Sequence, residues 1–299
     1  YYILFLVNTS ISYWFSSYKA SVLYADQKEY IKTNVQNTMA ILQSGLQIVL
    51  LLLFRKYLLY LLIQLAGNIF LNLYVAHLVD KRYPEIQTYQ GASLSAEERV
   101  QIRKDTEALV LSRFGHVALN GTDNIIISAV VGVLWVGRLS NYTLICDSIT
   151  SVLCQITAAI TGSLGNFFAT EDKHAGYALF KKVEFLNFWL YGFSFIALVT
   201  LLDPFVQIWA GERFVLGLPI SIAIAINFFV AGYMNTLWVF RSNLGLFKQG
   251  KFRPILVAIL NIILSIFLGK LWGVFGVLFA TFLSRAAISL WYDPLILHR

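Results

Sequence analysis

Five polar residues share one helical face of an apolar segment near residues 108–134. They recur at intervals of about three or four positions: Arg113, His116, Asn120, Asp123 and Asn124. Ionisable groups are costly inside a bilayer and normally face a bundle interior or a water-filled cavity. The pattern therefore predicts a hydrated lumen that meets a polar cargo or a coupling proton or cation. An alternative is that Arg113 and His116 lie near the inner interface while Asp123 makes one interhelical contact.

Two further ionisable residues lie within apolar segments. Asp147 shares a helical face with small and hydroxyl residues, and close helix packing explains most of this face. A functional role for Asp147 is therefore no better supported than a carboxylate that bonds to its neighbours near the outer interface. Arg285 lies seven residues before Tyr292, ~10 Å below the cytoplasmic end of its helix. Its guanidinium fits a phosphate or pyrophosphate oxygen pair. Snorkelling to the interface, or pairing with Asp123 or Asp147, would also explain it.

The segments that must position these residues are long and apolar. The composition is 58% hydrophobic and 13% charged, whereas soluble domains carry about a quarter charged residues. A bilayer-spanning helix needs ~20 mostly apolar residues, and backbone groups facing lipid must pair within their own helix. The sequence therefore predicts an all-α polytopic membrane protein. Nine candidate spans lie near residues 1–17, 37–54, 57–79, 108–134, 139–168, 184–203, 215–240, 253–270 and 273–292.

The basic residues concentrate in alternate loops. A net charge of +7 would suit a nucleic-acid partner, but its distribution along the chain argues against one. The opposite loops carry only a few basic residues, namely Arg55, Lys56, Arg138, Arg213 and Lys270. This asymmetry follows the positive-inside rule. It places the first residue outside and the last residue in the cytoplasm.

A polar stretch divides the chain. We expect residues 1–79 to hold the last three helices of an N-terminal lobe, residues 80–106 a cytoplasmic linker, and residues 107–299 a six-helix C-terminal lobe. Within the linker, Ser95 and Glu98 have the spacing of a capping box, which predicts a short surface helix. The chain opens on Tyr1 inside an apolar segment, which we interpret as a fragment.

Motifs for nucleotide hydrolysis and metal binding are missing. The sequence contains no G-x-x-x-x-G-K-[ST] loop and no H-E-x-x-H motif. Cys146 and Cys154 lie ~12 Å apart on one predicted helix, too far for a disulfide. No cytoplasmic loop places two aspartates two residues apart, as a metal-dependent glycosyltransferase would require. We therefore expect no enzyme, no catalytic residue, no cofactor and no metal.

Short motifs along most of the chain resemble the polysaccharide flippases of the Wzx type. These belong to the multidrug/oligosaccharidyl-lipid/polysaccharide exporter superfamily. The motifs are ADQK at 25–28, TDNIIIS at 122–128, VGRLSNY at 136–142, GSLGN at 162–166, DPF at 203–205, WAG at 209–211, FRSNLGLF at 240–247 and WYDP at 291–294.

The resemblance implies two pseudo-symmetric six-helix bundles, of which this chain would supply helices four to twelve. It also implies movement of undecaprenyl-pyrophosphate-linked oligosaccharide repeat units across the bacterial cytoplasmic membrane by alternating access. The expected partners are this lipid-linked oligosaccharide and membrane lipids. A proton or sodium gradient and polysaccharide polymerase or assembly proteins are further candidate partners. The family carries no universal catalytic signature, so Arg113, Asp123 and Arg285 are candidates from the helix pattern alone.

Three alternatives stay open. A cation-coupled multidrug or metabolite exporter of the same superfamily would use Asp123 or Asp147 as its ion site. A membrane glycosyltransferase or polymerase would act on the same lipid carrier. The short outer loops argue against this alternative, because an outward-facing polymerase would need a larger catalytic loop there. A non-transporting scaffold for polysaccharide assembly would tolerate neutralisation of the whole polar face at residues 108–134.

Overall fold

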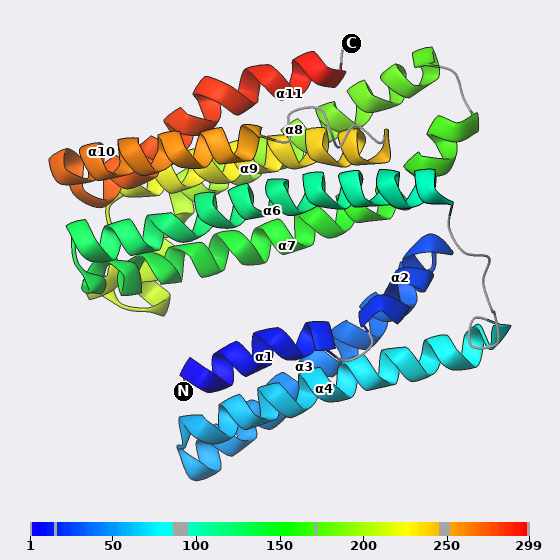
Figure 1. Cartoon of the computed structure of the whole chain (residues 1–299). Helices are drawn as coiled ribbons and strands as arrows, with labels where there is room; N and C mark the ends of the chain where they lie inside the picture. The colour runs from blue at the N-terminus through cyan, green and yellow to red at the C-terminus, as the bar shows by residue number, and fades with distance from the viewer. Residues whose placement is uncertain (1, 15–16, 86–94, 171–172, 245–251, 298–299) are drawn as a thin grey trace. The chain divides into compact units, whose positions relative to one another are not determined.

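The computed structural model describes residues 2–14, 17–85, 95–170, 173–244 and 252–297. This part of the chain is all-α, as the sequence predicts, with ten α-helices and no strand. The chain forms two compact units, Tyr1–Ser93 and Leu94–Arg299. Each unit has its own buried contacts and is described by itself (Figure 1).

The described residues of the first unit form four helices. They are α1 (Tyr2–Trp14), α2 (Ser17–Ala25), α3 (Glu29–Phe54) and α4 (Tyr57–Arg82). Arg55 adopts a left-handed conformation with φ 52°, which ends α3 and allows α4 to begin two residues later. A small core around Leu23, Val75 and Val79 joins α2 to α4. An ion pair of 2.6 Å between Lys19 Nζ and Asp80 Oδ2 joins the same two helices.

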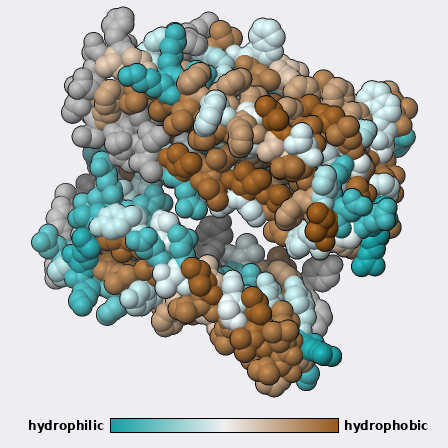
Figure 2. Space-filling model, turned by 180° about the vertical axis from the view of Figure 1, so that it is seen from behind, coloured by the Kyte–Doolittle hydropathy of each residue, from teal (hydrophilic) through white to brown (hydrophobic). Residues whose placement is uncertain are grey.

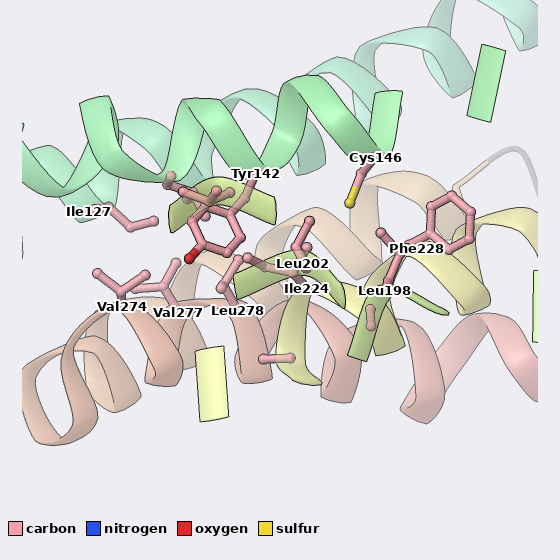
Figure 3. Close-up of a cluster of buried hydrophobic side chains, with 14 of the residues drawn as sticks. Ile127, Tyr142, Cys146, Leu198, Leu202, Ile224, Phe228, Val274, Val277 and Leu278 are labelled. Carbon is pink, nitrogen blue, oxygen red and sulfur yellow. The ribbon is translucent and has the colours of Figure 1, made fainter. Parts of the chain in front are cut away.

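The second unit contains the longer helices. They are α6 (Ala96–Val130), α7 (Val133–Thr170), α8 (Lys173–Trp209), α9 (Leu218–Asn243), α10 (Arg253–Ser284) and α11 (Leu290–Leu297), with a 3₁₀ turn at Glu212–Phe214 and a π-helix at Arg285–Ser289. Helix α6 packs along α10, and α8 packs along α9 (Figure 1). The main core centres on the fully buried side chains of Ile127, Tyr142 and Val277 (Figure 3).

Helix α10 is a hairpin of two antiparallel arms. Gly273 breaks the helical conformation with φ 61° and ψ −138°, a conformation that favours glycine. After the break the chain turns back (Figure 1), and Asn261 on the first arm bonds to Thr281 on the second. A Cβ added to Gly276 would lie only 2.0 Å from the carbonyl oxygen of Leu268. The predicted spans at 253–270 and 273–292 are therefore two arms that pack backbone against backbone.

The predicted capping box begins α6. Ser95 Oγ accepts a hydrogen bond of 3.2 Å from the backbone N–H of Glu98, and Glu98 Oε2 accepts one of 2.8 Å from the N–H of Ser95. The expectation of a short surface helix is wrong, because α6 continues for 35 residues to Val130. No proline interrupts this stretch, and the helix ends next to Gly132, whose φ is 129°.

Five helices of the described chain are long and apolar enough to cross a membrane. They are Glu29–Phe54, Tyr57–Arg82, Ala175–Trp209, Leu218–Asn243 and Arg253–Tyr292. Large apolar side chains such as Ile208, which is 88% exposed, cover their outer faces, and Figure 2 shows broad hydrophobic areas on the surface. These features fit a multi-pass membrane protein. The predicted spans at 1–17, 108–134 and 139–168 are not among the five.

Candidate functional site

A polar network inside the second unit joins α6 to both arms of α10. Thr281 Oγ1 donates a hydrogen bond of 2.7 Å to Asp123 Oδ2, and Asn261 Nδ2 donates one of 2.9 Å to Thr281 Oγ1. Thr122 Oγ1 lies 3.5 Å from Asn261 Oδ1. Asn261 and Thr281 are buried, so the network lies among packed helices. A carboxylate from the predicted polar face of α6 thus meets two polar side chains of α10.

The shape of the α10 hairpin explains why these groups meet. The close approach of Gly276 to Leu268, and of Gly269 to Val277, brings the two arms together without intervening side chains. Asn261 on one arm and Thr281 on the other then lie within hydrogen-bond distance. Small residues allow this kind of close contact between membrane helices, and polar residues then bond across it.

Three buried oxygen atoms in this region have no hydrogen-bond partner in the described part of the chain. They are Oδ1 of Asp123, Oδ1 of Asn227 and Oγ of Ser265; Ser265 is fully buried one helical turn after Asn261. A buried polar atom without a partner is costly, and each one in a folded protein needs an explanation. An oxygen-rich position with one carboxylate is suited to a proton or to a hard cation. No group of three or more His, Cys, Asp or Glu side chains gathers in the described residues.

Arg285 lies beside the network. It follows Thr281 by four residues and begins the π-helix Arg285–Ser289; π-helical turns within α-helices often occur at functional sites. Its Nη1 donates a hydrogen bond of 3.4 Å to the backbone oxygen of Asn227 on α9. Asn227 is itself held by a 2.8 Å bond from its Nδ2 to the oxygen of Leu278. Arg285 and Asp123 attract each other electrostatically.

The structure places the other predicted residues elsewhere. Arg113 and Asn124 are exposed on α6, and Asp147 is exposed on α7. In the described part of the chain Asp147 makes no hydrogen bond or ion pair. The side chains of His116 and Asn120 lie outside the described residues. Of the predicted set, Asp123 is therefore part of the network, and Arg285 lies beside it within electrostatic reach of Asp123.

Sequence reasoning missed four members of this region. Asn227, Asn261, Ser265 and Thr281 are polar residues within otherwise apolar segments. Asn261 and Ser265 are four residues apart, as are Thr281 and Arg285, so each pair lies on one helical face. The sequence signal that could have identified them is a pair of polar residues four positions apart in each of the two adjacent spans.

A second polar group ties together α7, α8 and α9. Tyr142 of α7 donates a hydrogen bond of 2.5 Å to Asp203 Oδ1 of α8, and Ser221 of α9 donates one of 2.8 Å to the same oxygen. The backbone N–H of Leu216 donates to the Tyr142 hydroxyl at 2.9 Å. The hydroxyl is thus both donor and acceptor, and the group holds three helices and the connection before α9.

Comparison with protein-family models, with curated proteins and with solved structures found no match.

Proposed function

We propose that this chain belongs to a flippase of the Wzx type in the bacterial cytoplasmic membrane. The cargo is an undecaprenyl-pyrophosphate-linked oligosaccharide repeat unit, moved by alternating access between two helix bundles. One observation carries the proposal: Arg285 and Asp123 lie close enough within the apolar second unit to attract each other electrostatically, and ionisable groups there normally mark a transport path. The family-like motifs, among them the one containing Asp123, support the same class.

Arg285 is the proposed contact for the pyrophosphate. Its planar guanidinium suits bidentate recognition of phosphate oxygens better than a lysine ammonium would. The bond to Asn227 O, and the anchoring of Asn227 on Leu278 O, restrict the position of the side chain. A fixed guanidinium loses less conformational entropy when it binds an anion.

Asp123 is the proposed coupling site. A cation held by Oδ1, with the side-chain oxygens of Asn261 and Thr281 nearby, would neutralise the carboxylate. The attraction between Asp123 and Arg285 would then weaken, which changes how strongly Arg285 binds an anion. Coupling of this kind is reciprocal, so cargo would alter cation affinity by the same factor. Several oxygens, rather than a single base, favour sodium over a proton.

The test is complementation of a strain that lacks the gene. We expect this strain to accumulate lipid-linked oligosaccharide in the inner leaflet, and the wild-type gene to relieve the accumulation. Arg285→Ala should fail to relieve it although the protein reaches the membrane in normal amounts. The matched control is Arg213→Ala, because Arg213 is exposed and lies over the ring of Phe214. Full complementation by Arg285→Ala would contradict the proposed role of Arg285.

A cation-coupled exporter of small molecules is the second candidate. The observation that favours it is the partnerless Oδ1 of Asp123, which suits a coupling ion whatever the cargo. In that case the deletion strain would not accumulate lipid-linked oligosaccharide. It would instead become sensitive to a toxic compound, and Asp123→Asn would fail to restore resistance.

A further inference from the structure

An aromatic groove of about 1320 Å³ runs along the second unit between α8 and α9. Its walls include Phe185, Trp189 and Phe193 of α8 and Phe229 of α9, with Phe282 of α10 at one side. The three α8 side chains are exposed. In a membrane, this groove would therefore face lipid.

Polar groups gather at one end of the groove. Lys181, Glu184 and Tyr233 line this end. Tyr233 donates a hydrogen bond of 3.0 Å to Glu184 Oε1, which holds the carboxylate against α9. The Lys181 ammonium lies 4.9 Å from the ring centroid of Tyr177 and is exposed. With Glu184 held by Tyr233, the exposed Lys181 ammonium is the group left to meet a head group, so the groove suits a ligand that is apolar along most of its length and has an anionic head.

The length and direction of the groove narrow the ligand further. Lys181 and Ile196 mark its extent on α8, which is ~22 Å at the rise of an α-helix. One leaflet contributes about 15 Å of hydrocarbon, so a groove of this length that starts at the cytoplasmic interface would reach past the bilayer midplane. Its polar end is on the side that the distribution of basic residues assigns to the cytoplasm.

We propose that this groove binds the hydrocarbon chain of a polyprenyl phosphate lipid, with the phosphate at Lys181. A single chain that crosses the midplane suits a polyprenyl lipid better than a glycerophospholipid confined to one leaflet. The proposal rests on the proposed function, since it concerns the lipid carrier of the same cargo. The groove would hold the lipid in the inner leaflet as an entry position, which the head group leaves for Arg285 during transport.

Gly192 offers a direct test because it lies on the groove wall. A Cβ at Gly192 would meet only Cε2 of Phe229, at 3.9 Å, so Gly192→Ala should fold normally. Gly192→Leu should extend a side chain into the groove and block it. Gly137→Leu is the matched control, because nothing lies within 4 Å of a Cβ at Gly137 on α7.

The probe is a polyprenyl monophosphate with a photoactivatable diazirine in its chain. The protein is reconstituted in phosphatidylcholine vesicles, illuminated and digested, and the labelled peptides are identified by mass spectrometry. We expect labelling between residues 185 and 196. Gly192→Leu and Lys181→Gln should each reduce labelling several-fold, whereas Gly192→Ala and Gly137→Leu should retain it.

Competition decides between lipid classes. Unlabelled polyprenyl phosphate should displace the probe, and phosphatidylglycerol at the same mole fraction should not. Equal displacement by phosphatidylglycerol would overturn the proposal and indicate a general lipid contact. Full labelling of a correctly folded Gly192→Leu would also overturn it.

A flipping assay in the same vesicles separates this proposal from the proposed function. If α8 is labelled but lipid-linked oligosaccharide is not flipped, lipid binding in the groove is supported and the proposed flippase function is contradicted. If flipping occurs while the probe labels other segments, the proposed flippase function is supported and lipid binding in the groove is contradicted.

Discussion

Thr281 and Asp123 are 158 residues apart in sequence, yet Oγ1 of Thr281 donates a hydrogen bond of 2.7 Å to Oδ2 of Asp123. The same hydroxyl accepts a hydrogen bond from Asn261. It therefore holds the carboxylate of α6 against both arms of the α10 hairpin. The following expectations test this contact and the features around it.

Thr281→Val should destabilise the protein. Valine keeps the shape of threonine but removes the donor to Asp123 and the acceptor for Asn261. A buried polar group left unsatisfied costs about 1–3 kcal/mol. Thermal unfolding in detergent measures the change. Thr200→Val is the control, because Thr200 is exposed and its hydroxyl bonds only within α8. Equal melting temperatures for both variants would contradict the network.

Asp123→Asn should abolish stabilisation by sodium. A ligand that binds only the folded state at 100 times its Kd adds about 2.7 kcal/mol of stability. We expect the wild-type melting temperature to rise in sodium chloride relative to choline chloride at equal ionic strength, and Asp123→Asn to show no such rise. Asp147→Asn, an exposed position on α7, should behave as wild type. Loss of the sodium effect in Asp147→Asn alone would assign the ion site to α7.

Gly276→Ala should disrupt the α10 hairpin. The added Cβ would lie 2.0 Å from the carbonyl oxygen of Leu268, so the two arms must separate. Overpacking of this kind costs about 1–3 kcal/mol, occasionally more. Gly137→Ala is the control, since its Cβ meets nothing within 4 Å and alanine favours a helix. A Gly276→Ala protein as stable as Gly137→Ala would mean that the arms are not packed backbone to backbone.

Tyr142→Phe should loosen the junction of α7, α8 and α9. The change removes the donor to Asp203 and the acceptor for the N–H of Leu216. Since Tyr142 is fully buried (Figure 3), water cannot easily replace the hydroxyl, and we expect a loss of about 1–3 kcal/mol. Tyr74→Phe, exposed in the first unit, should change the stability little. Urea or thermal unfolding compares the two.

Glu98 should make the start of α6 sensitive to acid. The backbone N–H and the hydroxyl of Ser95 lower the pKa of Glu98 below its ordinary value. A carboxyl whose pKa is lowered on folding stabilises the fold above its unfolded pKa, and this stabilisation is lost as pH falls through the folded pKa. Ser95→Ala should shift the Glu98 titration midpoint back towards the ordinary value. Carbon-13 NMR of the labelled carboxyl measures this shift, and an unchanged midpoint would contradict the capping box.

Features that depend on nearby residues could be predicted from the sequence. The capping box requires only Ser95 and Glu98, three positions apart. The two spans on either side of Gly273 follow from their apolar composition, because a helix in lipid must satisfy its own backbone. The all-α class follows for the same reason. The continuation of α6 to Val130 was missed, because polar composition suggested an end that no glycine or proline imposes.

Tertiary structure decided which of the polar residues are buried and contact one another. Asp123 and Asn124 are neighbours in the same motif, but successive residues of an α-helix differ in direction by about 100°, at 3.6 residues per turn. Which direction is buried depends on where α10 packs, and α10 begins 130 residues after Asp123. The sequence alone determined that helices of this composition belong in a bilayer. Only the packing of the α10 hairpin against α6 decided that Asp123 meets Asn261 and Thr281, because contact between distant segments is not encoded in the periodicity of either one.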